Sequence, residues 1–213
     1  MNLKKWDDDL ENLIIRKERK DDYFNVEYMT KKAFWNLHVP GCSEHYLVNI
    51  LRKSDDYIED LSRVAELNGE IVGTIMYTKS YVINETDSTE VLTFGPLCVD
   101  PSYQNKGIGK ALLETTMELA KKDGHRAIII YGEPEYYPRY GFKTCDNFGI
   151  TTKDSKNFPA FMAIELVPNG LKDVHGRFYE SRVFEELIEE KVEEFDKKFP
   201  YMQKLKLPGQ WDF

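Results

Sequence analysis

The sequence contains a turn whose residue types could bind an anion. It reads Gln104-Asn105-Lys106-Gly107-Ile108-Gly109-Lys110 and lies between an apolar run and a helix-like pattern. Glycines let a ligand approach the backbone closely, and a helix start exposes unpaired N–H groups and the positive end of the helix dipole. The lysines on both sides add positive charge. We therefore expect this turn to hold a negatively charged group.

Two common nucleotide-binding motifs do not fit this turn. A dinucleotide fingerprint requires a third glycine at the position that Leu112 occupies. A P-loop requires glycine at position 104 and serine or threonine at position 111, where this chain has Gln104 and Ala111. The glycines therefore belong to a different motif.

A second group of reactive side chains follows the next apolar run. Glu133 and three tyrosines, Tyr136, Tyr137 and Tyr140, lie close together in the segment Glu133-Pro-Glu-Tyr-Tyr-Pro-Arg-Tyr-Gly-Phe142. A tyrosine hydroxyl, with a pKa of about 10, can protonate a thiolate, whose acid has a pKa of about 8.5. This segment is therefore a candidate for proton transfer.

The cysteines offer less chemistry. Cys98 lies within an apolar run with no base beside it in the sequence, which favours a core residue over an acyl-carrying nucleophile. Cys42 and His45 are too few for a zinc site, which needs three or four ligands. Three sparse cysteines favour a reducing compartment, so we expect a cytoplasmic protein.

Composition excludes several classes of protein. The 213 residues are 41 % hydrophobic and 31 % charged, as in ordinary globular domains. The net charge of −8 disfavours a nucleic-acid binder, which would carry a basic surface. No run approaches the roughly 20 apolar residues of a membrane span, and the first residues lack the apolar core of a secretory signal. We expect neither a nucleic-acid nor a membrane partner.

Hydrophobic periodicity predicts the elements that must position these groups. Helices are expected over residues 22–37, 43–54 and 108–122, the second with Ser43 as its N-cap. A hairpin is expected around Asn68-Gly69, and buried strands over 91–99 and 127–131. A short helix or turn at 135–140 and a last strand at 161–167 complete a mixed α/β domain.

These patterns together resemble the GNAT superfamily of acyl-CoA N-acyltransferases, in particular its YhbS-like branch. The motif Q-x-x-G-x-G is supplied by Gln104, Gly107 and Gly109, and Y-x-x-x-G-F begins at Tyr137. The resemblance covers about residues 12–170, so we expect a GNAT domain at 1–170. It implies a mixed central β-sheet with splayed central strands and flanking helices.

The resemblance also implies acetyl-CoA as co-substrate and assigns residues to it. The turn would surround the pyrophosphate through Gln104, Asn105, Lys106, Gly107, Ile108, Gly109 and Lys110. The pantetheine arm would pair like an extra strand with Leu97, Cys98 and Val99.

By the same resemblance, a primary amine attacks the thioester directly, without an acyl-enzyme or a metal. Tyr137 would protonate the departing thiolate, and a backbone N–H near Val99 would hold the oxyanion. Glu133 is the first candidate for the base and Asp100 the second. Glu44, His45 and Tyr46 are read either as contacts to the acceptor or as part of a capped turn.

The last residues, 171–213, are expected to form a C-terminal extension with one amphipathic helix. Its apolar stripe comprises Phe184, Ile188, Val192, Phe195 and Phe199. The stripe is expected to pack on the preceding domain. The alternatives are a dimer contact or a wall of the acceptor pocket.

Two functions remain open from the sequence. The first is an N-acetyltransferase whose acceptor is a small-molecule or protein amine. The second is a non-catalytic acyl-CoA-binding or regulatory module, because a fold and a cofactor site do not establish turnover.

Overall fold

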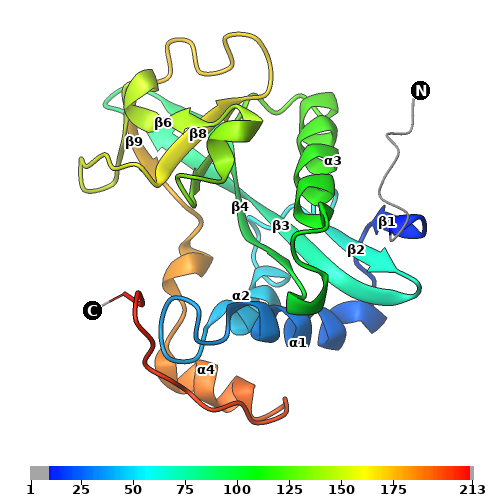
Figure 1. The fold of residues 1–213 in the computed structure, drawn as a ribbon. Helices are drawn as coiled ribbons and strands as arrows, with labels where there is room; N and C mark the ends of the chain where they lie inside the picture. Colours follow the sequence, from blue (N-terminus) through cyan, green and yellow to red (C-terminus); the bar gives the residue numbers. More distant parts are fainter. Residues whose placement is uncertain (1–9, 212–213) are drawn as a thin grey trace.

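The computed structural model describes residues 10–211, in which nine strands form one mixed sheet with helices on both faces (Figure 1). The strands are β1 (Leu13–Arg16), β2 (Arg63–Leu67), β3 (Glu70–Ile83), β4 (Ser88–Val99), β5 (Ala127–Tyr131), β6 (Lys143–Thr144), β7 (Ile150–Thr152), β8 (Phe161–Glu165) and β9 (Gly176–Tyr179). The α-helices are α1 (Tyr23–Phe34), α2 (Glu44–Leu51), α3 (Ile108–Lys122) and α4 (Glu189–Asp196). Short 3₁₀ helices are η2 (Lys20–Asp22), η3 (Pro101–Tyr103), η4 (Tyr137–Tyr140), η5 (Cys145–Phe148) and η6 (Arg182–Glu185).

The sheet has the order β1-β2-β3-β4-β5-β8-β6, and β9 pairs with both β3 and β7. Neighbours along that path are antiparallel except β4 and β5, which are parallel and joined through α3. The hairpin expected at Asn68-Gly69 is confirmed, since both residues have positive φ and join β2 to β3. This is the mixed α/β arrangement that the sequence predicts.

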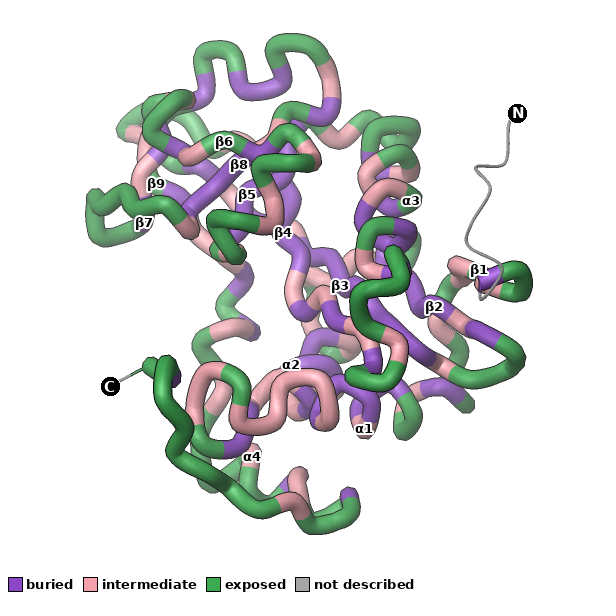
Figure 2. Tube along the Cα trace, in the orientation of Figure 1, coloured by how far each residue is buried: buried purple, intermediate pink, exposed green. Residues whose placement is uncertain are grey.

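Helices cover the two faces because strand side chains alternate between them. Ile108, Leu112 and Leu113 of α3 pack with Ile75 and Tyr77 of β3 on one face. On the other face the neighbouring residue Met76 packs against side chains from both α1 and α2. Each fully buried leucine or isoleucine here contributes about 1.5–3 kcal/mol relative to exposure. Figure 2 shows β3 and β4 as the buried centre of the fold.

The two central strands diverge after a single ladder pair. β4 and β5 are in register only at Leu92 and Ile128, although β4 continues to Val99. Beyond that pair, β4 remains bonded to β3 on its other side, with Thr74 opposite Cys98. The edge of β4 at residues 97–99 therefore faces away from β3 without β5 beside it, which is the splay expected of a GNAT sheet.

The C-terminal part differs from the single helix that the apolar spacing predicts. The expected stripe is split between η6 and α4, because Glu186 ends η6 and Ile188 is the extended N-cap of α4. Phe199 lies beyond the end of α4, and Ile188 is 48 % exposed. The stripe is therefore not one continuous helix face.

The strands β7 and β9 were not predicted from the sequence. β9 lies after residue 170 and joins the sheet by pairing Val82 with Phe178, and β7 pairs with it in parallel. The division of the chain at residue 170 stays a prediction, but the segment after it contributes a strand to the same sheet.

Candidate functional site

The glycine turn opens the longest helix of the described chain. Gly107 has φ +87° and is the N-cap of α3, and Asn105 also has positive φ. The N–H of Ala111 is the first donated inside the helix, to Gly107 O, so the amides of Ile108, Gly109 and Lys110 precede the helical hydrogen bonds. The start of α3 thus presents backbone donors and the positive end of its dipole.

A cavity of about 530 Å³ joins this turn to the splayed end of β4. Its lining includes nearly all residues that the resemblance assigns to the co-substrate: Leu97, Cys98, Val99, Gln104, Asn105, Gly107, Ile108, Gly109 and Lys110. Lys106 is not among the lining residues, and its ammonium group lies 5.7 Å from the centre of the Tyr103 ring. The remaining lining residues are Ala33, Phe34, Leu37, Tyr103, Glu133, Tyr136, Tyr137, Arg139 and Tyr140.

The backbone of β4 turns one amide toward this cavity. The N–H of Asp100 is donated to Val72 O on β3. Because successive N–H groups of a strand point to opposite edges, the N–H of Val99 points to the other edge, away from β3. The carbonyl of Val99 shares that edge and accepts a hydrogen bond from Gln104 Nε2 at 3.2 Å. A hydrogen-bond donor therefore faces the place where β5 has diverged.

Tyr137 is held among aromatic rings. Its ring centre lies 5.8 Å from that of Phe94 and 5.4 Å from that of Phe142. Burial raises the pKa of Tyr137 above its ordinary value, and the nearby Glu133 carboxylate raises it further. The phenol is therefore protonated at neutral pH and can donate.

A glycine that sequence reasoning missed makes room for this ring. A Cβ on Gly132 would lie 2.4 Å from Cε2 of Tyr137, too close for any other residue unless the ring moved. The signal in the sequence was the lone glycine directly after the strand Ala127–Tyr131.

Tyr136 lies over the glycine turn. Its hydroxyl is 3.3 Å from the position that a Cβ of Gly109 would take, and it accepts a hydrogen bond from Tyr140 at 3.2 Å. Burial raises the pKa of Tyr136 as well, and the bond from Tyr140 adds to the increase. The Tyr136 hydroxyl is therefore a neutral group close to the helix start.

The two candidate bases differ in their surroundings. Glu133 lines the cavity next to Tyr137. Asp100 is ion-paired with Lys32, and its Oδ1 accepts from the N–H of Ser102 at 3.0 Å. Burial pushes the pKa of Asp100 upward, but the bonds from Lys32 and Ser102 outweigh it and hold the pKa below its usual range. Asp100 is thus occupied as the N-cap of η3, and Glu133 is the better placed of the two.

Cys98 lines the cavity but its thiol is turned toward α1. Sγ lies 3.6 Å from Thr30 Oγ1 and 3.9 Å from Met29 Sδ. Burial raises the thiol pKa to about 12. The interpretation of Cys98 as a core cysteine fits these contacts.

Cys42, His45 and Asp196 form a second cluster, in an order that resembles nucleophile, base and acid. Cys42 Sγ lies 3.4 Å from His45 Nδ1, and His45 Nε2 lies 3.1 Å from Asp196 Oδ1 without hydrogen-bond geometry. Burial raises the pKa of the Cys42 thiol and lowers the pKa of His45 to about 4, so both are neutral. The ammonium of Lys31 lies 2.7 Å from Asp196 Oδ1 and neutralises it. The cluster is therefore suited to holding segments together rather than to attack.

The residues considered as acceptor contacts lie away from the cavity. None of Glu44, His45 and Tyr46 is among its lining residues. The Glu44 carboxylate accepts a hydrogen bond from the N–H of Ser43 at 3.0 Å, at the start of its own helix. The Ser43 side chain makes no capping hydrogen bond. The alternative of a capped turn describes these residues better, with Glu44 in the capping role.

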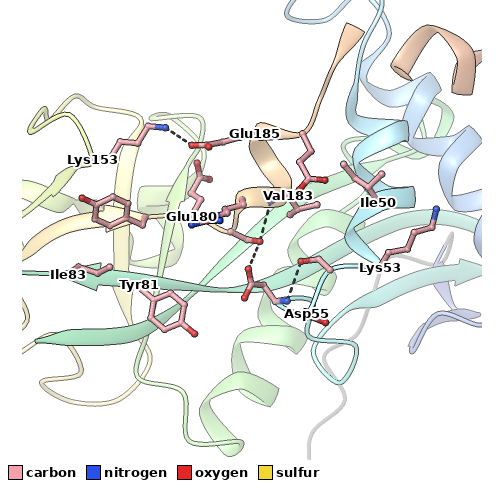
Figure 3. Close-up of a pocket in the computed structure, with 15 residues that line it drawn as sticks. Ile50, Lys53, Asp55, Tyr81, Ile83, Lys153, Glu180, Val183 and Glu185 are labelled. Carbon is pink, nitrogen blue, oxygen red and sulfur yellow. Dashed lines mark hydrogen bonds and ion pairs between the residues drawn. The ribbon is translucent and has the colours of Figure 1, made fainter. Parts of the chain in front are cut away.

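A larger cavity of about 860 Å³ lies on the other side of β3, next to β9 (Figure 3). Its charged lining comprises five carboxylates, Asp55, Asp56, Glu180, Glu185 and Glu186, against three cations, Lys53, Lys153 and Arg182. Lys153 pairs with Glu185 at 2.5 Å, and Ser181 Oγ donates to Asp56 at 2.6 Å. Burial raises the pKa of Glu180 to about 7. A cavity with this lining does not favour an anion.

Residues 10–211 lack two features, a metal-ligand cluster and a membrane-spanning helix. No group of three or more His, Cys, Asp or Glu side chains in this range is arranged to hold a metal ion. No helix in the same range has the length and apolar character needed to span a bilayer.

Comparison with known proteins agrees with the fold. Residues 26–142 match the family described as "Acetyltransferase (GNAT) family". The chain is 34 % identical over 127 residues to the "Uncharacterized N-acetyltransferase YjhQ" of Escherichia coli. The aligned region covers 59 % of this chain and 67 % of that protein.

Two solved structures share the fold. The crystal structure of the GNAT family N-acetyltransferase YhbS from Escherichia coli in complex with CoA has a TM-score of 0.73 at 22 % identity, covering 82 % of this chain and 93 % of that one. A GNAT family acetyltransferase from Brucella melitensis in complex with acetyl-CoA has a TM-score of 0.65 at 25 % identity, covering 81 % of this chain and 97 % of that one.

Proposed function

This chain belongs to the acetyltransferase (GNAT) family, and from that premise we propose that it is an acetyl-CoA-dependent N-acetyltransferase acting on a primary amine. The observation that carries the proposal is the cavity of about 530 Å³, which connects the start of α3, the free edge of β4 and the Tyr137 ring. Binding, oxyanion stabilisation and proton transfer would then take place within one cavity.

The turn from Asn105 to Lys110 would bind the pyrophosphate of CoA. Its amides precede the helical hydrogen bonds, the helix dipole is positive there, and the first turn Ile108-Gly109-Lys110-Ala111 has no acidic side chain. The Tyr136 hydroxyl, close to Gly109, is a further donor for a phosphate oxygen. The amides of the pantetheine arm would pair with the free edge of β4 at residues 97–99, so that the arm acts like an additional strand.

Acetyl-CoA, when bound, supplies a thioester whose carbonyl carbon a neutral amine attacks directly. The N–H of Val99 is the candidate donor to the developing oxyanion, because it points away from β3 into the splay. Such preorganised donors are worth about 2.7–4 kcal/mol in acyl transfer.

Tyr137 would donate the proton that the departing thiolate takes up. Its raised pKa keeps it protonated before transfer, and it lies beside the end of the diverged strands. Glu133 would accept the proton that the amine loses, directly or through a water molecule. Since Glu133 and Tyr137 are neighbours, a proton gained by one can offset that lost by the other.

We also propose that the protein works in the cytoplasm. The support is chemical: Cys42, Cys98 and Cys145 are all free and buried, which suits a reducing compartment. The acceptor is proposed as a small-molecule or protein amine.

The test is release of CoA from acetyl-CoA in the presence of a panel of small amines and lysine peptides. Release that depends on the amine and yields the acetylated product would support the proposal. Tight binding of acetyl-CoA by calorimetry, with no release for any amine, would favour the non-catalytic acyl-CoA-binding module instead. Binding of ATP or NAD without any binding of CoA would reject both.

A further inference from the structure

The end of the described chain lies across the loop that joins α1 to α2. We define this segment, residues 200–211, as the C-terminal strap, and residues 35–42 as the α1–α2 loop. Figure 1 shows the strap running from α4 past this loop. The N–H of Trp211 is donated to His38 O at 2.8 Å, and the two rings stack with centres 4.4 Å apart. The strap thus contacts the loop at its far end.

Asn36 is the main link between the strap and the loop. Its Nδ2 donates to Gln203 O at 2.9 Å, and its Oδ1 accepts from the N–H of Leu205 at 3.0 Å. Its carbonyl oxygen accepts from Gln210 Nε2 at 2.8 Å. The side chain and the carbonyl of one loop residue therefore bind three residues of the strap.

The same residue also closes the loop on itself. Asn36 has φ +59°, a left-handed conformation that asparagine tolerates better than most residues. Its N–H is donated to Gly41 O at 2.9 Å, and the N–H of Gly41 returns a bond to Asn36 Oδ1 at 2.8 Å. The path of the loop therefore depends on Asn36, the residue to which the strap is hydrogen-bonded.

The strap is anchored before it reaches the loop. Lys31 is fully buried, with its ammonium 2.7 Å from Asp196 Oδ1 and 3.0 Å from Pro200 O, to which it donates. Phe195 and Phe199 are also buried, and their ring centres lie 5.7 Å from that of His45 and 5.5 Å from each other. The start of the strap is thus fixed against α1 and α2.

The loop reaches the proposed reaction cavity directly. Phe34, at the end of α1, and Leu37, next to Asn36, both line it, and Leu37 is 54 % exposed. The turn and the edge of β4 are assigned to the co-substrate, so these apolar side chains are left for the acceptor. An apolar wall favours an amine that carries a hydrocarbon chain.

We propose that the C-terminal strap determines acceptor specificity: it holds the α1–α2 loop so that Leu37 and Phe34 form an apolar wall for the carbon chain of the amine. This inference rests on the proposed N-acetyltransferase function. Asn36 and Gln210 are positioning residues in it, since they act through Leu37 and do not reach the reacting atoms.

Three variants separate the strap from general stability. Asn36→Gly keeps the left-handed backbone and removes the amide bonds, and Gln210→Ala removes the bond to the loop carbonyl. Gln203→Ala is the matched control, because the Gln203 residue is exposed. The substitution retains the backbone carbonyl of residue 203, which accepts hydrogen bonds from Trp35 and Asn36. Asp196 is unsuitable for substitution, because its loss would remove the carboxylate that lies 2.7 Å from the buried Lys31 ammonium.

The probes are n-hexylamine and ethylamine, which share the amine and differ in apolar chain. The wild type is expected to prefer hexylamine. The variants Asn36→Gly and Gln210→Ala are expected to raise the KM of hexylamine about tenfold and to leave the KM values of acetyl-CoA and ethylamine unchanged. Amide hydrogen exchange at residues 35–42 should accelerate in both variants and remain unchanged in Gln203→Ala.

Each contrary result has a distinct meaning. Unchanged exchange at residues 35–42 in both variants, or no preference for hexylamine in the wild type, would overturn the inference. A wild type that binds no acetyl-CoA would reject the proposed function, whereas the exchange measurement would still report on the strap.

Discussion

The cavity at the start of α3 and the cavity beside β9 differ in where their polar atoms come from. The cavity of about 530 Å³ presents backbone amides at the start of α3, one strand amide and tyrosine hydroxyls. The cavity of about 860 Å³ presents five carboxylates and three basic side chains, with Glu185 paired to Lys153. The larger cavity is therefore the less suited to an anionic co-substrate, and volume alone is a poor guide to a reaction site.

Burial raises the pKa of a residue in each cavity, but the consequences differ. It raises the pKa of Tyr137 in the smaller cavity and of Glu180 in the larger one. The tyrosine stays neutral at every physiological pH, so its desolvation costs little. Glu180, with a pKa of about 7, changes charge near neutrality, so the larger cavity makes the stability depend on pH.

The largest expected difference between the cavities concerns their tyrosines. Tyr137→Phe should lower kcat by about 10²–10⁴, the usual contribution of an acid–base group, with the Kd of acetyl-CoA little changed. Tyr81→Phe, in the larger cavity, is the matched control and should leave kcat as it is. Steady-state kinetics under conditions where chemistry limits turnover measures both. Equal losses in the two variants would remove the distinction between the cavities.

The second prediction compares the two ends of α3. Gly107 and Gly124 have φ of +87° and +85°, and neither has a neighbour within 4 Å of an added Cβ. Valine at either position should therefore impose similar backbone strain. Only Gly107→Val should also disturb the anion site, weakening CoA binding by about 10- to 100-fold.

Calorimetry with CoA and thermal melting decide this comparison. Similar decreases in Tm with loss of affinity in Gly107→Val alone would support the anion site. Loss of affinity in both variants would instead attribute the effect to a weakened helix.

The third prediction concerns the pH dependence that the larger cavity creates. The pKa of Glu180 is about 7 in the folded state and near 4.5 when exposed, mainly through burial, with Lys153 lowering it and Glu185 raising it. The folded state therefore binds this proton more tightly, and the free energy of unfolding falls as the pH rises from about 4.5 to about 7.

Glu180→Gln removes this titration. It should raise the free energy of unfolding by about 3 kcal/mol at pH 8 and change it little at pH 4.5, measured by urea denaturation. CoA affinity should not change. An equal gain at both pH values would mean that packing rather than ionisation limits stability there.

The smallest expected effect is that of one lysine at the turn. Lys110 lines the smaller cavity, half-exposed and 3.9 Å from Glu114. Lys110→Ala should weaken CoA binding about two- to fivefold at low ionic strength and less in 0.5 M salt, because exposed charges are screened. Lys121→Ala, in the last turn of α3, should have no effect on binding, and a salt-independent loss for Lys110→Ala would argue against a charge contact.

The elements that could be predicted are those encoded by local sequence. The helix at residues 108–122 and the hairpin at Asn68-Gly69 depend on spacing and turn residues that lie side by side in the chain. β7 and β9 were missed because they are short and are stabilised by partners far away in the sequence. The stripe from Phe184 to Phe199 was misread because apolar spacing does not reveal a helix break.

The same limit applies to the candidate site. The glycine turn and the Tyr137 segment are contiguous motifs, and the structure brings both to one cavity. The contact of Tyr137 with Gly132 and the bonds of Asn36 to the strap depend on tertiary geometry. No periodicity in the sequence indicates them.

The position of β9 has a consequence for how the protein is made. β3 emerges from the ribosome long before β9, which pairs with it at Tyr81, Val82 and Ile83. Until then this stretch of β3 is an unpaired edge, open to pairing with other nascent chains. A premature stop after β8 would therefore yield a polypeptide that carries the whole glycine turn and Tyr137 segment, yet is prone to aggregate through an edge that only the late strand covers.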